Sequence, residues 1–261
     1  MISGRNDFWD ILPWQAGPKH RLMLRPIDMT EWLADDAGLL RNKSDQLKNA
    51  YGAVVAQVPS FEPPQAADLP WQSETDEFPH WVANFAAHRA EDICLVDVTD
   101  ERRFVAGCVA APSYWSLQEK IGNPLFSVHD PVEGMNAKIG AQIDHFFQNM
   151  PLGQPFRRVN WLVHGTDRLF SAESENHLGG DVSKWWFRSE QQVLFRMNTR
   201  HVLFTIRVVQ VPVSDLAGRP EATQTLCDAL RSMDADEISH FGGRIKYDAL
   251  ASYVTLLLEQ G

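Results

Sequence analysis

Strand-like and helix-like segments follow one another along this chain in an order that excludes a parallel βαβ sheet. Apolar runs typical of strands occur at 93–98, 104–110, 157–164, 185–196 and 201–213. The clearest helical pattern, 136–150, separates the first two runs from the last three, so strands and helices do not alternate. This order predicts an α+β domain with an antiparallel sheet and a helical middle, although 185–196 also fits a helix.

Further helices are expected on both sides of this central region. Spaced apolar residues predict that the segment Leu22–Tyr51 is helical, and 220–261 is expected to form two helices broken at Gly242-Gly243. Five prolines in Pro59–Pro79 indicate a loop or a wrapping arm. We therefore expect one compact unit with three parts: an N-terminal helical arm and proline-rich wrap (1–75), a core (76–215) and C-terminal helices (216–261).

Charge and cysteine content exclude several classes of function. The chain has 24 Lys and Arg against 34 Asp and Glu, a net charge of −10, which disfavours nucleic acid as a partner. Three cysteines without a C-x-x-C pair predict no disulfide framework and fit a reducing compartment.

No apolar stretch is long enough to span a membrane, and the first residues do not resemble a secretory signal. We expect a cytoplasmic protein without a membrane partner.

Several motifs of familiar enzymes are missing from the sequence. Neither G-x-G-x-x-G after a strand nor the P-loop pattern occurs, so flavin or NAD(P)H chemistry would have to reside on another chain. G-x-S-x-G and H-E-x-x-H are also absent, which disfavours an α/β-hydrolase and a zinc protease.

His129 is the leading candidate for a metal ligand among the nine histidines. It follows the apolar run Leu125–Val128 and precedes Asp130-Pro131, and the proline restricts the backbone before it. A stiff backbone suits an axial ligand, whose ring must meet a metal in one orientation. The alternative is a histidine that caps a strand end. His145, on the polar side of the 136–150 helix, is the rival ligand. His164 ends the 157–164 strand on the same side as Arg158 and Asn160 and could line a pocket, although it could also lie at the surface.

The 185–196 segment carries an unusual polar face. If it is a strand, then Arg188, Glu190 and Gln192 point to one side. They could face water, as on a one-sided sheet, or line a polar pocket in which an arginine anchors a carboxylate.

Five segments, in order between about residues 22 and 210, resemble the haem-dependent oxidative N-demethylase family. The resemblance lies in Leu24-Arg25-Pro26 with Glu31-Trp32-Leu33; in Trp115, Lys120-Ile121-Gly122, Leu125 and Val128-His129-Asp130-Pro131-Val132; in Arg158-Val159-Asn160-Trp161; in Arg188 to Leu194; and in Phe204-Thr205-Ile206-Arg207. The chain departs from the family pattern at Glu133 and at Arg196-Met197-Asn198.

The resemblance implies a modified PAS fold, with 76–215 as a PAS-like core that holds haem b. It also implies oxidative removal of a methyl group from a small secondary amine such as dimethylamine, with O2 as co-substrate. Electrons would come from NADPH through separate flavin and iron–sulfur reductase subunits. On this interpretation His129 binds the iron, and the other cofactor-binding residues are Trp115, Arg158, Asn160, Trp161, Arg188 and Gln192.

Glu190 is the candidate catalytic residue, because a carboxylate can position a small ammonium ion and accept its proton. The alternative is an ordinary Glu–Arg pair on a solvated strand. Two other functions use the same fold: a haem-binding sensor without catalysis, and an interaction module with an empty pocket.

Overall fold

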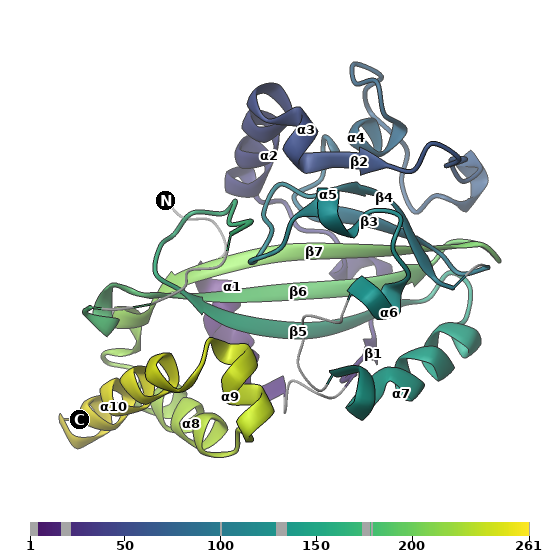
Figure 1. The fold of residues 1–261 in the computed structure, drawn as a ribbon. Helices are drawn as coiled ribbons and strands as arrows, with labels where there is room; N and C mark the ends of the chain where they lie inside the picture. Colours follow the sequence, from purple (N-terminus) through teal and green to yellow (C-terminus); the bar gives the residue numbers. More distant parts are fainter. Residues whose placement is uncertain are drawn as a thin grey trace.

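One antiparallel sheet organises the molecule (Figure 1). The computed structural model describes residues 5–16, 22–99, 101–128, 135–173, 178 and 180–260. Within these ranges the sheet has seven strands in the order β1-β5-β6-β7-β3-β4-β2. Their bounds are β1 (Arg25–Pro26), β2 (Val55–Gln57), β3 (Asp92–Asp97), β4 (Arg103–Cys108), β5 (Pro155–His164), β6 (Trp186–Arg196) and β7 (His201–Pro212).

The five central strands have a PAS-like arrangement. Without the short edge strands β1 and β2, the order is β4-β3-β7-β6-β5, so the first strand of the core lies between the second and the last. Both hairpin pairs, β3 with β4 and β6 with β7, are antiparallel. The α+β class, the five predicted strands and the strand interpretation of 185–196 are thereby confirmed.

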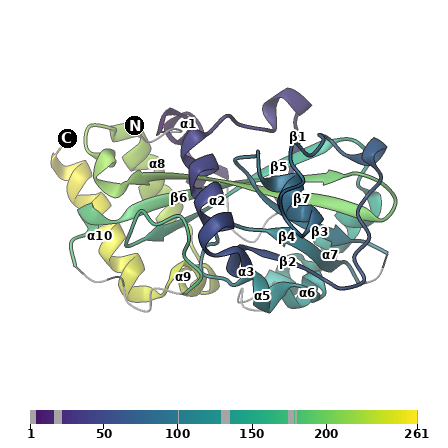
Figure 2. The same cartoon turned by 90° about the horizontal axis from the view of Figure 1, so that it is seen from above.

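Helices precede, interrupt and follow this core (Figures 1 and 2). They are α1 (Arg5–Asp10), α2 (Ala37–Asn49), α3 (Tyr51–Val54), α4 (Trp81–Ala86), α5 (Leu117–Lys120), α6 (Leu125–Val128), α7 (Met135–Asn149), α8 (Pro220–Arg231), α9 (Ala235–Phe241) and α10 (Arg244–Gln260). The predicted central helix and the break at Gly242-Gly243 are confirmed. No helix in the described ranges has the length and apolarity needed to cross a membrane.

The structure corrects two predictions about helices. The N-terminal helix does not fill Leu22–Tyr51: α2 starts only after Asp36, whose side chain accepts hydrogen bonds from the Gly38 and Leu39 amides at 3.0 and 3.1 Å. Before it, Arg25–Pro26 pairs with β5 as an edge strand, a place where proline is tolerated. The C-terminal part has three helices rather than two, because Asp234 forms a capping box that starts α9.

Strand register divides the side chains of the sheet between two faces. Asn160 lies opposite Glu190, and Trp161 lies opposite Ser189, so the two β5 residues point to opposite sides. We call the two sides the Glu190 face and the Trp161 face. In Figure 1, α5 and α6 lie in front of the sheet, and Leu117 of α5 packs with Phe104 and Phe204 on the Glu190 face.

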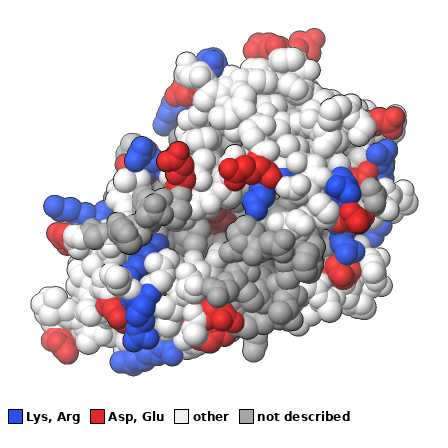
Figure 3. Space-filling model, in the orientation of Figure 1, with Lys and Arg blue, Asp and Glu red and all other residues white. Residues whose placement is uncertain are grey.

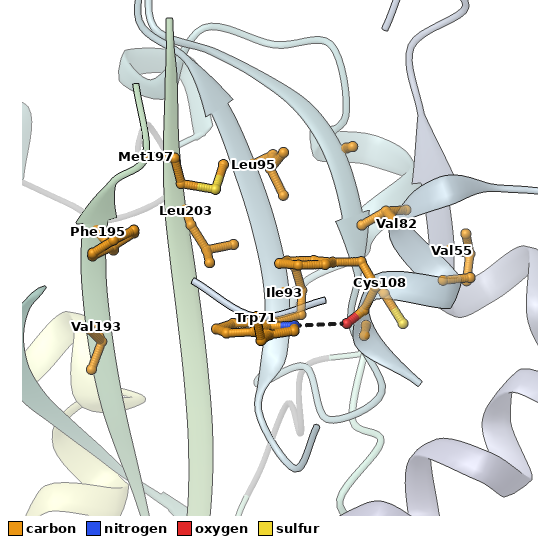
Figure 4. Close-up of a cluster of buried hydrophobic side chains, with 14 of the residues drawn as sticks. Val55, Trp71, Val82, Ile93, Leu95, Cys108, Val193, Phe195, Met197 and Leu203 are labelled. Atoms are coloured by element: carbon orange, nitrogen blue, oxygen red, sulfur yellow. Dashed lines mark hydrogen bonds between the residues drawn. The ribbon is translucent and has the colours of Figure 1, made fainter. Parts of the chain in front are cut away.

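The Trp161 face is buried by two apolar clusters. One lies over β2, β3, β4 and β7 and takes residues from the proline-rich segment (Figure 4). There the ring of Trp71 stacks on Phe85 at a centroid distance of 4.7 Å, and its indole nitrogen donates to the Phe85 carbonyl at 3.1 Å. The proline-rich segment is therefore held to the sheet by a buried aromatic anchor.

The second cluster joins the two ends of the chain. Trp161 packs with Trp14 from the N-terminal segment and Phe241 from α9, at centroid distances of 5.9 and 5.5 Å. Leu226 of α8 and Leu250 of α10 complete this cluster and are fully buried. Because both clusters mix segments from different parts of the chain, packing is continuous across residues 75 and 215. The three-part division stays a prediction.

Candidate functional site

The Glu190 face carries a group of polar side chains in the middle of a buried sheet. Arg158 lies opposite Gln192, and Asn160 lies opposite Glu190, so these four point to one side. Arg188 is one alternate position further along β6 and shares that side. Side chains of two neighbouring strands, β5 and β6, are thus brought together by the period of two alone.

Glu190 is the centre of this group, and only 6% of it is exposed. Its Oε2 accepts hydrogen bonds from Gln192 Nε2 at 2.8 Å and Asn160 Nδ2 at 3.4 Å. Its Oε1 accepts a short hydrogen bond from the Ser113 hydroxyl. A carboxylate offers about four lone-pair positions. Three donors therefore fix the group and leave room for one more.

Arg188 is fully buried and saturated with hydrogen bonds. Its Nε donates to Ser113 Oγ at 2.8 Å, and its terminal nitrogens donate to the carbonyls of Ala111 at 2.6 Å and Leu169 at 3.1 Å. Burial lowers the pKa of this guanidinium, and the nearby Glu190 and Asp92 carboxylates oppose that shift. Arg188 therefore holds two loops against the sheet. Its donors are already used by these hydrogen bonds, so we do not expect it to bind the carboxylate of a ligand.

Arg158 differs from Arg188 in having no hydrogen-bond partner in the described part of the chain. Its Nε is inaccessible to solvent and unpaired. Burial lowers the pKa of its guanidinium, and the Glu190 carboxylate opposes that shift. The residue is half-buried, and a cation that is partly removed from water without hydrogen bonds carries a desolvation cost. An anionic group of a ligand would satisfy it.

His164 is a second unsatisfied group on the same face, at the end of β5. It is completely buried, and within the described ranges neither ring nitrogen has a hydrogen-bond partner. Its ring stacks on Tyr114 at a centroid distance of 4.2 Å. Burial, with Arg188 and Lys246 nearby, lowers its pKa to about 3, so the imidazole is neutral at physiological pH.

Tyr114 takes an unusual backbone conformation to make this stack. Its φ is 63°, in the left-handed region that a bulky side chain rarely adopts. The strained turn also places Ser113 between Arg188 and Glu190. Strain of this kind persists where surrounding contacts impose it, often at functional sites.

Apolar side chains surround the polar group on the described part of this face. Trp115 is partly buried and packs in a cluster with Cys94, Phe104 and Leu117. Ile143 and Phe147 of α7 form another cluster with Val202 and Leu194. Figure 3 shows acidic and basic side chains interspersed over this side of the molecule.

The predicted site residues divide into three sets. The structure brings Arg158, Asn160, Arg188, Glu190 and Gln192 together, and it places Trp115 on the covering side of the same face. Trp161 is not among them, because it lies on the opposite face inside the core formed by the chain ends. His129 and Asp130 lie outside the described residues.

The structure shows the surroundings of two other histidines and reveals two site residues that the sequence did not indicate. The rival ligand His145 is exposed on α7 and contacts Asn149. His164, which the strand pattern placed beside Arg158 and Asn160, is the more buried histidine. Ser113 and Tyr114 were missed, and no local pattern marks them, because their contacts lie about 50 to 77 residues away.

The described residues fit a haem in two respects. Arg158 offers a half-buried cation that a propionate would satisfy, and the aromatic and aliphatic side chains on this face offer an apolar wall. No group of three or more His, Cys, Asp or Glu able to hold a metal ion occurs in the described ranges. Haem iron can be held through a single axial residue, so a haem site does not require such a group of ligands.

These features define a PAS-like α+β domain with a partly unsatisfied polar site on a buried sheet face. The family model for the haem-dependent oxidative N-demethylase, alpha subunit-like proteins matches residues 66–250. This match covers more than half of the chain, and the protein belongs to that family. The family is haem-dependent and oxidative by its description, and the word subunit implies partner proteins.

Proposed function

We propose that this chain binds haem b on the Glu190 face and removes a methyl group from a small secondary amine such as dimethylamine. The observation that carries this proposal is a charge arrangement. A buried carboxylate fixed by three donors lies beside a half-buried guanidinium that has no hydrogen bond within the described residues. The carboxylate suits an ammonium ion, and the guanidinium suits a propionate.

Arg158 would bind a propionate, and Trp115 would contact the macrocycle. His129 would ligate the iron, as the family resemblance implies, and it lies outside the described residues. When bound, the haem would supply the O2 chemistry that oxidises the methyl carbon. The overall balance is one amine, one O2, two electrons and two protons giving the smaller amine, formaldehyde and water. The electrons would come from NADPH through separate flavin and iron–sulfur subunits.

Glu190 would orient the amine. Its Oε2, already fixed by Gln192 and Asn160, would accept a hydrogen bond from the ammonium nitrogen and then its proton. Ser113 holds the other oxygen, so the carboxylate cannot rotate away. The apolar cover would exclude water, which strengthens the attraction between the two charges.

The first experiment is a titration of the purified full-length chain with haemin. We expect a saturable Soret band, lost or shifted in His129→Ala and unchanged in His145→Ala, the matched control with an exposed ring. A chain that shows no saturable spectral change would be an interaction module with an empty pocket.

The second experiment separates an enzyme from a haem-binding sensor. Dimethylamine is added to the haem-loaded chain with dithionite or a reductase as electron source, under O2, and formaldehyde is measured. Glu190→Gln keeps the shape and removes the charge. Its amine-induced Soret shift and turnover should fall at least about tenfold, the size of a lost interaction of about 1.4 kcal/mol. Glu119→Gln on the exposed side of α5 is the control. Normal haem content without formaldehyde would indicate the sensor.

A further inference from the structure

A separate cavity lies at the other end of the sheet. Its volume is about 270 Å³, and it is enclosed by the β3–β4 hairpin, the start of β7 and the segment after β2. Register places Arg103, Asp97 and His201 in one row across three strands. His201 is on the Trp161 face, two residues before Leu203, whereas Glu190 points to the opposite face. We call this space the His201 cavity.

His201 is an unsatisfied polar group in the wall of this cavity. Only 4% of it is exposed, and neither ring nitrogen has a hydrogen-bond partner among the residues that the structure describes. Its backbone amide is bonded to Asn198 Oδ1 at 2.7 Å, so the residue is fixed. A buried polar atom without a partner costs about 1–3 kcal/mol. Burial lowers the pKa of His201, so its neutral ring presents one donor and one acceptor.

Two arginines line the same cavity. Arg200 Nε contacts Asp97 Oδ2 at 2.7 Å, and Arg103 donates to the Gly122 carbonyl at 2.9 Å. Their outer nitrogens pair with Glu62 and Glu101, whose side chains are 82% and 63% exposed. Pairs with exposed carboxylates are weak, so an anion in the cavity can replace those carboxylates.

Asp97 positions Arg200 rather than receiving a ligand. It accepts hydrogen bonds from the Thr99 amide at 2.9 Å and the Thr99 hydroxyl at 2.6 Å, besides the contact with Arg200. Burial alone would raise the pKa of Asp97, but these hydrogen bonds lower it, so the carboxylate stays ionised. Its acceptor positions are largely used by these donors.

Apolar side chains form the rest of the wall, including Val58, Phe61 and Val105. The Phe61 ring meets His201 edge to face at 6.2 Å. A water molecule takes about 30 Å³ in the liquid, so the cavity has room for roughly nine waters. A small organic acid with a short carbon chain therefore fits in it together with several waters.

We propose that the His201 cavity binds a small organic carboxylate, with Arg103 and Arg200 on the carboxylate and His201 on a neighbouring hydroxyl. The hydroxyl of a hydroxycarboxylate gives one ring nitrogen of His201 a partner, since a hydroxyl can donate to the bare nitrogen or accept from the N–H. The site is independent of the proposed haem site, because it lies on the opposite face of the sheet.

Isothermal titration of the full-length chain with three probes tests this. We expect lactate to bind more tightly than propionate, and propionamide, which has the same shape without the charge, to bind at least tenfold more weakly than propionate. Arg200→Gln should weaken propionate binding at least tenfold. Arg89→Gln should leave it unchanged, since Arg89 also pairs with an exposed carboxylate, Glu74, but lies outside the cavity.

His201→Leu should abolish the preference for lactate over propionate, and Arg103→Gln serves as a second variant should His201→Leu fail to fold. Equal affinity for propionamide and propionate would overturn the proposal, as would unchanged binding in both arginine variants. The readout is carboxylate affinity, so failure of haem binding would leave it standing, and failure here would leave the haem proposal standing.

Discussion

Arg158 and Arg188 can be compared to test which arginine of the Glu190 face stabilises the fold and which one we propose to bind the ligand. Both guanidinium groups lie on the Glu190 face, on neighbouring strands, and burial lowers the pKa of each. Arg188 makes hydrogen bonds to Ser113 and to carbonyls of two loops, whereas Arg158 makes none in the described part of the chain. We compare Arg188→Met with Arg158→Met, because methionine keeps much of the stem and removes the charge.

The expected magnitudes follow from the partners that each change leaves behind. Without Arg188, the carbonyls of Ala111 and Leu169 and the hydroxyl of Ser113 lose a donor in a buried place. Each unsatisfied group costs about 1–3 kcal/mol, and the removed desolvation of the cation offsets part of that. We expect a loss of about 3–5 kcal/mol in the free energy of unfolding, which lowers Tm by roughly 10 °C.

Arg158→Met leaves no hydrogen-bond partner unsatisfied among the described residues. It removes both the desolvation cost of the charge and its attraction to Glu190. Because these two effects oppose each other, we expect the Tm of the haem-free protein to be nearly unchanged. Its haem affinity should fall at least tenfold, because the propionate loses its cation.

The assay is thermal unfolding followed by near-ultraviolet circular dichroism on haem-free protein, together with haemin titration of both variants. Equal destabilisation by the two substitutions would refute the reasoning, since it would mean that Arg158 has partners equivalent to those of Arg188. Unchanged haem affinity in Arg158→Met would remove Arg158 from the cofactor site.

Two further predictions concern buried titratable groups. The pKa of His164 is about 3 in the folded chain against 6.5 as the ordinary value, so the unfolded chain binds more protons between these pH values. Because of His164, the free energy of unfolding therefore falls as pH falls from 6.5 toward 3, by up to about 1.4 kcal/mol per pH unit. Urea titrations at several pH values should show a shallower loss for His164→Phe; parallel curves would contradict this. Burial raises the pKa of Cys108 to about 12 and that of Cys94 well above its ordinary value, and Cys227 is also buried. Native protein should react with a thiol reagent at none of the three until urea unfolds it.

Local periodicity was sufficient to predict the strands and the sides to which their residues point. Arg188, Glu190 and Gln192 were assigned to one side of β6, and Arg158, Asn160 and His164 to one side of β5, from alternation alone. A period of two is a property of extended backbone and does not depend on what packs against it. The same holds for α7, whose 3.6-residue period was clear in the sequence.

Edge strands and helix starts were predicted less well, for a physical reason. β1 and β2 have only two and three residues, too few for a period, and they form because β5 and β4 offer free hydrogen-bonding edges. The start of α9 depends on a capping contact between Asp234 and Glu237, a local signal that was present in the sequence and overlooked.

The sequence by itself therefore determined the order of the core strands, the side on which each polar residue lies, and the family resemblance. Only the tertiary structure decided which loops cover each face. Arg188 donates hydrogen bonds to the carbonyls of Ala111 and Leu169, whereas Arg158 makes no hydrogen bond within the described residues. Trp161 packs in the core formed by the chain ends, away from the polar group to which its neighbour Asn160 belongs. These contacts join segments that are tens of residues apart in the sequence. They depend on how the whole domain packs, so no local sequence pattern encodes them.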